Sequence, residues 1–311
     1  MVVRRRTLLA VTLLAPFGAC GSAGVDAPGQ GSAPGSGSSQ NPAVAANDED
    51  VAAARFAELE SRFDARLGVY AVDSGTGREL SHRADERVPM CSTFKVLAAA
   101  AVLDRNSAEH LDLRVRYRAA DVVPFSPITE SHVDDGLTIR ELCDAAVRHS
   151  DNTAGNLLLD DLGGPGEITT FARSLGDRVT RLDRREPELN SAVPGDDRDT
   201  TSPRAIAADY RELVLGSRLD DMDRALLTSW LVGNTTGDTR IRAGLPAGWR
   251  VGDKTGAGRY GVVNDVAIAW PPDAAPIVLA VLSARPTVDA KGDNVLIAQA
   301  AMVVADELGR T

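Results

Sequence analysis

Strand-like segments lie at both ends of this chain, and the long stretch between them has the spacing of helices. After a helical pattern over residues 50–66, residues 67–72 predict a strand, and a turn at 74–77 leads into a returning strand at 78–82. Three more strands and a closing helix are predicted near the other end, at residues 249–254, 262–270, 276–283 and 294–308. Strands so far apart can share one sheet if the middle of the chain is an insertion.

The middle of the chain, roughly residues 92–230, is predicted to be helical and rich in loops, with helices at 92–103, 139–149 and 203–215. The fold class we expect is α/β (α+β), with one antiparallel sheet built from both chain ends, flanked by the terminal helices and interrupted by an inserted all-helical domain. The expected α/β domain comprises residues 48–85 and 240–311, and the helical domain comprises residues 86–239.

Residues 1–20 are typical of an export signal, because three arginines precede a short apolar run at residues 8–14. Arg5 and Arg6 resemble a twin-arginine signal, with an ordinary basic leader as the alternative. Residues 17–20 resemble a lipoprotein cleavage box that would attach Cys20 to lipid; otherwise Cys20 is removed with the leader. We expect an exported protein, either held on the outer face of the cytoplasmic membrane as a lipoprotein or secreted.

Residues 21–47 consist mainly of Gly, Ser, Pro, Ala and Gln, a composition that cannot bury enough apolar surface to fold. We expect a disordered tether here.

The formal charge of −10 makes nucleic acid and anionic lipid surfaces unfavourable partners. The chain has three cysteines, too few for a disulfide framework, and its four histidines lack the spacing of a zinc site. Neither a metal nor another cofactor is expected.

Lysine is rare, and two of the three lysines lie in short motifs. Lys95 ends the segment Ser-Thr-Phe-Lys that begins at Ser92, and Lys254 begins Lys-Thr-Gly. Residues three apart share one face of a helix, so the Lys95 amine can reach the Ser92 hydroxyl. Elsewhere positive charge comes from arginine, which cannot act as a base. The pair therefore indicates a nucleophilic serine with an adjacent amine.

A third motif, Ser-Asp-Asn at residues 150–152, follows a predicted helix. In this order the three motifs resemble those of the penicillin-recognising serine enzymes. The segment at residues 181–190 is similar to the omega loop of class A β-lactamases and places a glutamate at Glu186. The resemblance covers the chain from about residue 50 to its end and implies a serine β-lactamase, a hydrolase that opens a cyclic amide through an acyl-enzyme.

The resemblance also implies a role for each motif residue. Ser92 is the nucleophile, Lys95 or Glu186 begins acylation, Ser150 passes a proton to the leaving nitrogen, and Glu186 with Asn190 directs the deacylating water. The implied substrate contacts are the Ser92 and Ala257 amides as oxyanion hole, Asn152 for the acylamino group, Lys254, Thr255, Gly256 and Arg240 for the carboxylate, and Phe125 as an aromatic gate. For Arg240 the alternative is a surface cation, with Arg242 competing for the role, and for Phe125 it is a core position.

Two features bear on stability and specificity. Arg184 and Asp199 resemble an ion pair that clamps the loop ends, which requires burial to be effective. Cys143 and Cys91 lie where some relatives have half-cystines, but Ala99 and Gly258 stand at the partner positions. We therefore expect buried thiols without a disulfide. Carbapenem turnover is not expected as the main activity.

We expect a monomer that acts on penicillins and on some cephalosporins and so confers antibiotic resistance. Two alternatives stay open. One is a D-Ala-D-Ala carboxypeptidase or transpeptidase of the same superfamily, which generally lacks the Glu186 carboxylate. The other is a β-lactam sensor domain that acylates and is not hydrolysed.

Overall fold

The computed structural model describes residues 42–309. The predicted export signal, the lipoprotein box and the tether up to residue 41 lie outside the described residues. No helix among residues 42–309 is long and apolar enough to cross a bilayer.

A five-stranded antiparallel sheet contains strands from both ends of the chain, as predicted. Its order is β2-β1-β9-β8-β7, so the strand β1 from the front of the chain pairs with β9 from the rear, with Leu67 opposite Ser283. The strands are β1 (Arg66–Asp73), β2 (Glu79–His82), β7 (Arg250–Ala257), β8 (Val263–Trp270) and β9 (Ile277–Ala284). The central strands are buried on both faces, which explains their nearly continuous apolar sequences.

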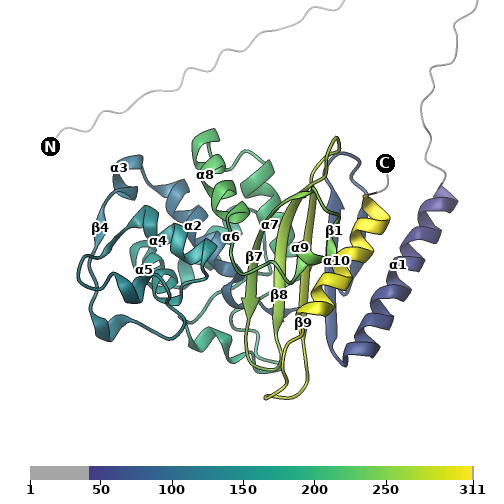
Figure 1. Cartoon of the computed structure of the whole chain (residues 1–311), viewed down its shortest axis with the longest axis horizontal. Coiled ribbons are helices and arrows are strands. Elements are labelled where there is room, and N and C mark those ends of the chain that lie inside the picture. The colour runs from purple at the N-terminus through teal and green to yellow at the C-terminus, as the bar shows by residue number, and fades with distance from the viewer. Residues whose placement is uncertain (1–41, 310–311) are drawn as a thin grey trace, which may run out of the picture. The chain divides into compact units, whose positions relative to one another are not determined.

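Helices cover both faces of this sheet (Figure 1). The terminal helices α1 (Pro42–Phe63) and α10 (Asn294–Leu308) pack side by side on one face, where Phe56 and Leu296 are buried against the strands. Helix α7 (Pro203–Leu215) packs on the other face and contacts β1, β8 and β9. Helix α1 begins six residues before the end of the predicted tether. Residues 42–47 are rich in alanine and start with a proline, which suits the first turn of a helix.

The helical middle of the chain is organised around α2 (Phe94–Arg105), in which residues 94–103 are all buried. Four consecutive alanines, at positions 98–101, let neighbouring helices approach α2 closely. The other long helices are α4 (Ile139–Arg148), α5 (Asn152–Leu162), α6 (Gly166–Ser174) and α8 (Asp221–Val232). Helix α2 is thus closely packed on all sides, and this packing fixes the position of the residues at its start.

Short elements complete this part of the chain. They are η1 (Cys91–Thr93), α3 (Ala108–Leu111), η2 (Ala119–Asp121), η3 (Thr129–Ser131), η4 (Glu188–Ser191), α9 (Ile241–Gly244), β3 (Val88–Pro89), β4 (Arg114–Val115), β5 (Leu137–Thr138) and β6 (Thr200–Thr201). Strand β3 pairs with β6, and β4 pairs with β5. The β3–β6 pair matters for the site, since it joins the segment before Ser92 to the segment after the 181–190 loop.

Candidate active site

Ser92 lies in the 3-10 turn η1 that leads directly into α2. Lys95 is in the first turn of α2, and its Nζ donates a hydrogen bond of 3.0 Å to the Ser92 Oγ. A residue far along the chain also holds this turn, because the Tyr210 hydroxyl of α7 donates to the carbonyl of Thr93 at 2.9 Å. The predicted serine–amine pair is therefore present and fixed by buried packing.

Glu186 reaches this pair from the 181–190 loop. The Ser92 hydroxyl donates to the Glu186 Oε1 at 3.1 Å, and the Lys95 Nζ lies 3.1 Å from the same oxygen. The Asn190 amide donates to the other carboxylate oxygen, Oε2. The Oδ1 of Asn190 is buried and has no donor among the described residues, so it is available to a water molecule. Hydroxyl, amine and carboxylate thus form one buried network.

The environment of Lys95 lowers the pKa of its amine. The side chain is fully buried, and this burial lowers the pKa of Lys95, although the negative charge of Glu186 opposes the shift. The Nζ also donates to the carbonyl of Ser150 at 2.8 Å and to the Asn152 Oδ1 at 2.6 Å. An amine in this position can exchange a proton with the Ser92 hydroxyl by a small movement.

The Ser-Asp-Asn motif forms the turn between α4 and α5. Ser150 has a positive φ of 56°, and Asp151 caps α5 by accepting from the Ala154 amide at 2.8 Å. The Asp151 carboxylate also accepts from the amide and the hydroxyl of Thr129, so its role is to fix the turn. As a result the Ser150 hydroxyl and the Asn152 amide both reach the cavity that contains Ser92.

Lys254 lies on β7, across the cavity from α2. Its Nζ donates to the Ser150 Oγ at 2.9 Å and to its neighbour's carbonyl, that of Thr255, at 2.9 Å. The side chain is fully buried, and burial followed by the charge of Lys95 lowers the pKa of Lys254 well below its ordinary value. Lys254 thus binds the hydroxyl of Ser150, while Lys95 binds its backbone carbonyl.

The structure selects Arg240 over Arg242 as the arginine of the cavity. The Arg240 Nη1 donates to the carbonyls of Gly256 at 2.8 Å and Asn264 at 2.7 Å, which holds the guanidinium against the edge of the β7–β8 pair. Arg242 points elsewhere, and its Nε donates to the Asp253 carboxylate at 2.5 Å. Arg240 is half-buried and lines the cavity, so the alternative of a plain surface cation is not favoured.

These side chains surround a cavity of about 310 Å³. Phe125 is at its rim with 64% of its surface exposed, so the alternative that Phe125 is a core residue is wrong. The Phe125 backbone has a positive φ of 63°. The residues that line the cavity are Ser92, Phe125, Ser150, Asn152, Asn190, Thr236, Arg240, Thr255, Gly256 and Ala257.

The ends of the 181–190 loop are clamped by a buried pair, as the sequence suggests. The Arg184 Nε lies 2.5 Å from the Asp199 carboxylate, which is fully buried, while Arg184 is 21% exposed. Asp199 also accepts from the amides of Asp183 at 2.7 Å and Arg184 at 2.9 Å. The Met90 amide donates to the Asp199 carbonyl at 2.9 Å, so the clamp is tied to the segment before Ser92.

Sequence reasoning missed two contributors. The Asn156 side chain, one turn along α5 from Asn152, donates to the Glu186 carbonyl at 2.9 Å and accepts from the Glu186 amide at 2.9 Å. The hydroxyls of Thr236 and Thr255 lie 2.5 Å apart and form one wall of the cavity. The helical spacing from Asn152 was the one available signal for Asn156, and a lone threonine in a loop gives none.

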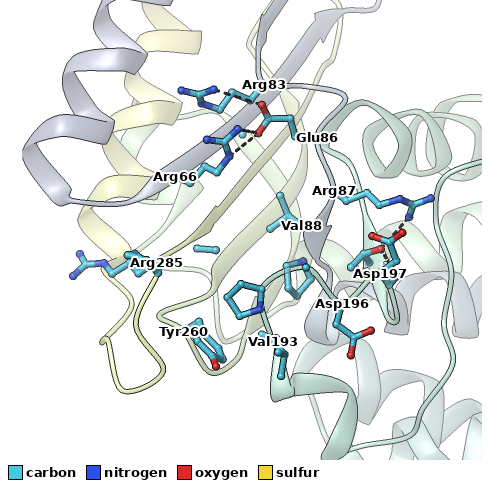
Figure 2. A pocket seen from close by; sticks show the side chains of 18 residues that line it. Arg66, Arg83, Glu86, Arg87, Val88, Val193, Asp196, Asp197, Tyr260 and Arg285 are labelled. Atoms are coloured by element: carbon cyan, nitrogen blue, oxygen red, sulfur yellow. Dashed lines mark hydrogen bonds and ion pairs between the residues drawn. The ribbon is translucent and has the colours of Figure 1, made fainter.

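A second cavity, of about 350 Å³, contains none of the motif side chains (Figure 2). Arg66 and Arg83 both contact Glu86 at one edge, and Val193 and Tyr260 lie at another. Its lining contains no serine, cysteine or lysine, so the predicted chemistry belongs to the cavity at Ser92. Among residues 42–309 no group of three or more His, Cys, Asp or Glu side chains could hold a metal ion.

The Ser92 hydroxyl is hydrogen-bonded to a buried amine and a buried carboxylate, and it lies beside a cationic pocket. This arrangement is typical of a hydrolase that works through an acylated serine. Comparison with known proteins shows which family of such hydrolases this is. A model of the β-lactamase enzyme family matches residues 51–308. The chain belongs to this family and is a class A serine β-lactamase, a hydrolase of β-lactams.

Individual relatives agree with this assignment. The β-lactamase AST-1 of Nocardia asteroides is 59% identical over 261 residues, which are 83% of this chain and 84% of the relative. The solved β-lactamase of Desulfarculus baarsii is 53% identical with a TM-score of 0.83, over 85% of this chain and 99% of that one. The class A β-lactamase of Clostridium kluyveri is 47% identical with a TM-score of 0.82, over 83% and 98%.

Proposed function

We propose that this β-lactamase hydrolyses penicillins and some cephalosporins through an acyl-enzyme on Ser92, and that it thereby confers antibiotic resistance. The observation that carries the proposal is the contact of Ser92 with both Lys95 and Glu186, at 3.0 and 3.1 Å. Acylation needs a group that takes the hydroxyl proton, and deacylation needs a group that activates water. Each is within reach of one serine oxygen.

In the first half-reaction the Ser92 oxygen attacks the lactam carbonyl, and its proton passes to Lys95 or, through a water molecule, to Glu186. The lowered pKa of Lys95 supports the first route. The backbone amides of Ser92 and Ala257 are proposed to hold the carbonyl oxygen as it becomes negative, and both residues line the cavity. Ser150, 2.9 Å from the Lys254 amine, is placed to give a proton to the departing nitrogen.

The substrate carboxylate is proposed to bind between Lys254, Thr255, Gly256 and Arg240, where an otherwise acidic protein concentrates positive charge. We propose that Asn152 holds the acylamino group and that Phe125 borders the entrance. Because Phe125 lies at the rim and lacks a hydroxyl, its contact with substrate is apolar.

In the second half-reaction Glu186 takes a proton from a water that attacks the ester. The carboxylate is held by Asn190 through its side chain and by Asn156 through its backbone. This group favours hydrolysis over the two alternatives, since a transpeptidase generally lacks this base and a sensor domain retains the ester.

We also propose that the enzyme is an exported monomer, reaching the outer face of the cytoplasmic membrane as a lipoprotein through Cys20, or secreted. The arginines and the apolar run of residues 1–20 support export. For the folded part we propose an α/β domain of residues 48–85 and 240–311 with residues 86–239 as the inserted helical domain. Mass spectrometry of the protein from its membrane fraction would detect acylated Cys20.

The test is turnover of benzylpenicillin and of a cephalosporin by the purified full-length protein and by Ser92→Ala. The control is Ser229→Ala, which removes an exposed hydroxyl on α8. We expect many turnovers for the parent and the control, and none above background for Ser92→Ala. Uptake of one equivalent without release would instead support the sensor, and hydrolysis of a D-Ala-D-Ala peptide without lactam turnover would support the carboxypeptidase.

A further inference from the structure

Two fully buried carboxyl groups lie behind the cationic side of the active-site cavity. Asp253 precedes Lys254 on β7, and Asp265 lies on β8 opposite Thr255. By the register of β7 and β8, the two side chains lie on the same face of the sheet as diagonal neighbours across the pairing. Because a carboxylate can only accept, two carboxyl groups can bond to each other when one of them holds a proton. The mechanism described above uses neither of them.

The contacts favour Asp265 as the carboxyl group that carries the proton. Asp253 accepts from the Arg242 Nε at 2.5 Å and from the Asn234 amide at 2.6 Å, the surroundings of an ionised carboxylate. Asp265 accepts through Oδ2 from the Ile241 amide at 3.1 Å. Its Oδ1 is buried and has no donor among the described residues. An oxygen without a donor in a dry site is costly as an acceptor and well placed as a hydroxyl donor.

The charges around the pair agree with one proton between them. Three cations and one weak acid lie around it, namely Arg240, Arg242, Lys254 and Tyr210. Burial raises the pKa of Asp253 above its ordinary 3.8, and the charge of Arg242 opposes this shift. Burial, and then the charge of Asp253, raise the pKa of Asp265 well above 3.8, with Arg240 opposing. The larger shift at Asp265 places the shared proton there. One negative charge beside Arg240 and Arg242 leaves the pocket positive, whereas two would cancel both arginines.

We propose that Asp265 is a positioning residue that works as a neutral acid: it donates to Asp253, accepts from the Ile241 amide, and so fixes Arg240 at the cavity without cancelling its charge. Arg240 immediately precedes the anchored peptide and reaches the cavity wall through the Gly256 carbonyl. The inference rests on the proposed binding of the substrate carboxylate by Arg240.

Two substitutions test whether the Asp265 side chain is a neutral acid or an ionised carboxylate. Asp265→Asn keeps the shape, one donor and one acceptor, so KM and kcat stay close to those of the parent. Asp265→Ala removes both hydrogen bonds, and KM rises roughly tenfold with a smaller change in kcat, as expected for a lost buried anchor. The control Asp85→Asn changes an exposed carboxylate far along the chain and leaves both constants unchanged.

Infrared spectroscopy detects a protonated Asp265 carboxyl group directly and needs no substrate. At neutral pH the parent shows the carbonyl stretch of a protonated carboxylic acid, and the difference spectrum between parent and Asp265→Asn contains that band. Asp209 is also buried with a raised pKa, but it is present in both proteins and cancels. A difference spectrum without the band overturns the proposal even if the enzyme turns over lactams normally.

The pH dependence of unfolding gives an independent reading. Above pH 3.8 the unfolded Asp265 loses its proton while the folded one keeps it, so the parent loses stability relative to Asp265→Asn as the pH rises. An equal stability difference at all pH values would mean an ionised Asp265 and would overturn the proposal. So would a failure of Asp265→Asn to fold, or a loss of kcat/KM as large as that of Asp265→Ala. Absence of lactam turnover in the parent would refute the proposed function, while the spectrum would still test the acid pair.

Discussion

The Ser92 hydroxyl lies 3.1 Å from a carboxylate oxygen of Glu186, although 94 positions separate the two residues in the chain. The contact depends on the pairing of β3 with β6 and on the Arg184–Asp199 clamp, which together bring the loop against the start of α2. Hydroxyl and carboxylate are both buried, so their interaction is little screened by solvent. The predictions below start from this geometry.

Glu186→Gln is expected to leave acylation observable and to slow deacylation by about 10²- to 10⁴-fold, because glutamine has the same shape but cannot accept the proton of water. Mass spectrometry after mixing with a penicillin should show a covalent adduct of one equivalent. The matched control is Glu188→Gln, an exposed carboxylate two residues along the loop, for which no adduct should persist. Rapid turnover by Glu186→Gln would remove Glu186 from the deacylation step.

Lys95→Arg is expected to lower kcat/KM by about 10³-fold, because arginine stays protonated and is too large for a fully buried site. For the parent, burial lowers the pKa of Lys95, so the amine can be neutral at a pH where an ordinary lysine is charged. Activity should therefore fall as the pH drops through this lowered pKa, on the acid side of the profile. The exposed Lys291→Arg serves as control, and an active Lys95→Arg would assign the proton transfer to Glu186 alone.

Much of this fold follows from local sequence. The predicted strands at 262–270 and 276–283 differ from β8 and β9 by one residue at their ends, and the helix at 203–215 matches α7. Periodicity is reliable here because apolar residues recur in these segments at the spacing of a helix or fill most of a strand. The start of α1 was predicted too late, since an alanine-rich segment inside a Gly/Ser/Pro-rich region was assigned by the composition of the region.

The motif residues could be predicted because three short motifs occur together in a fixed order, and two of them contain a lysine, which is rare in this chain. Contacts made across the fold could not. Local sequence does not distinguish Arg240 from Arg242. In the folded protein Arg240 binds the Gly256 carbonyl at the cavity, whereas Arg242 binds the Asp253 carboxylate. Asn156 likewise acquires its role from the loop that packs on α5. Such residues depend on packing between elements far apart in the chain, which local patterns do not encode.

The two thiols of the folded part are expected to be inert. Cys91 and Cys143 are free and buried, and burial raises the pKa of both thiols. Since the thiolate is the reactive form, an alkylating reagent should modify neither residue in the native protein and both after unfolding. Peptide mapping by mass spectrometry distinguishes the two sites. Native labelling of Cys91 would show that the segment before Ser92 opens in solution.

Asp199→Asn tests the clamp at the ends of the loop. The Asp199 carboxylate accepts from two amides and from the Arg184 guanidinium at 2.5 Å, and its burial prevents water from replacing them. The amide keeps one acceptor but no charge, so the free energy of unfolding should fall by about 2 kcal/mol, typical for a lost hydrogen bond between charged groups. The exposed pair of Asp85 with Arg204 is the comparison, and Asp85→Asn should cost less than about 1 kcal/mol. Urea unfolding measures both values.

Because the clamp also holds Glu186 near Ser92, Asp199→Asn should slow deacylation more than acylation, and an unchanged ratio of the two rates would mean that the loop keeps its place without the ion pair.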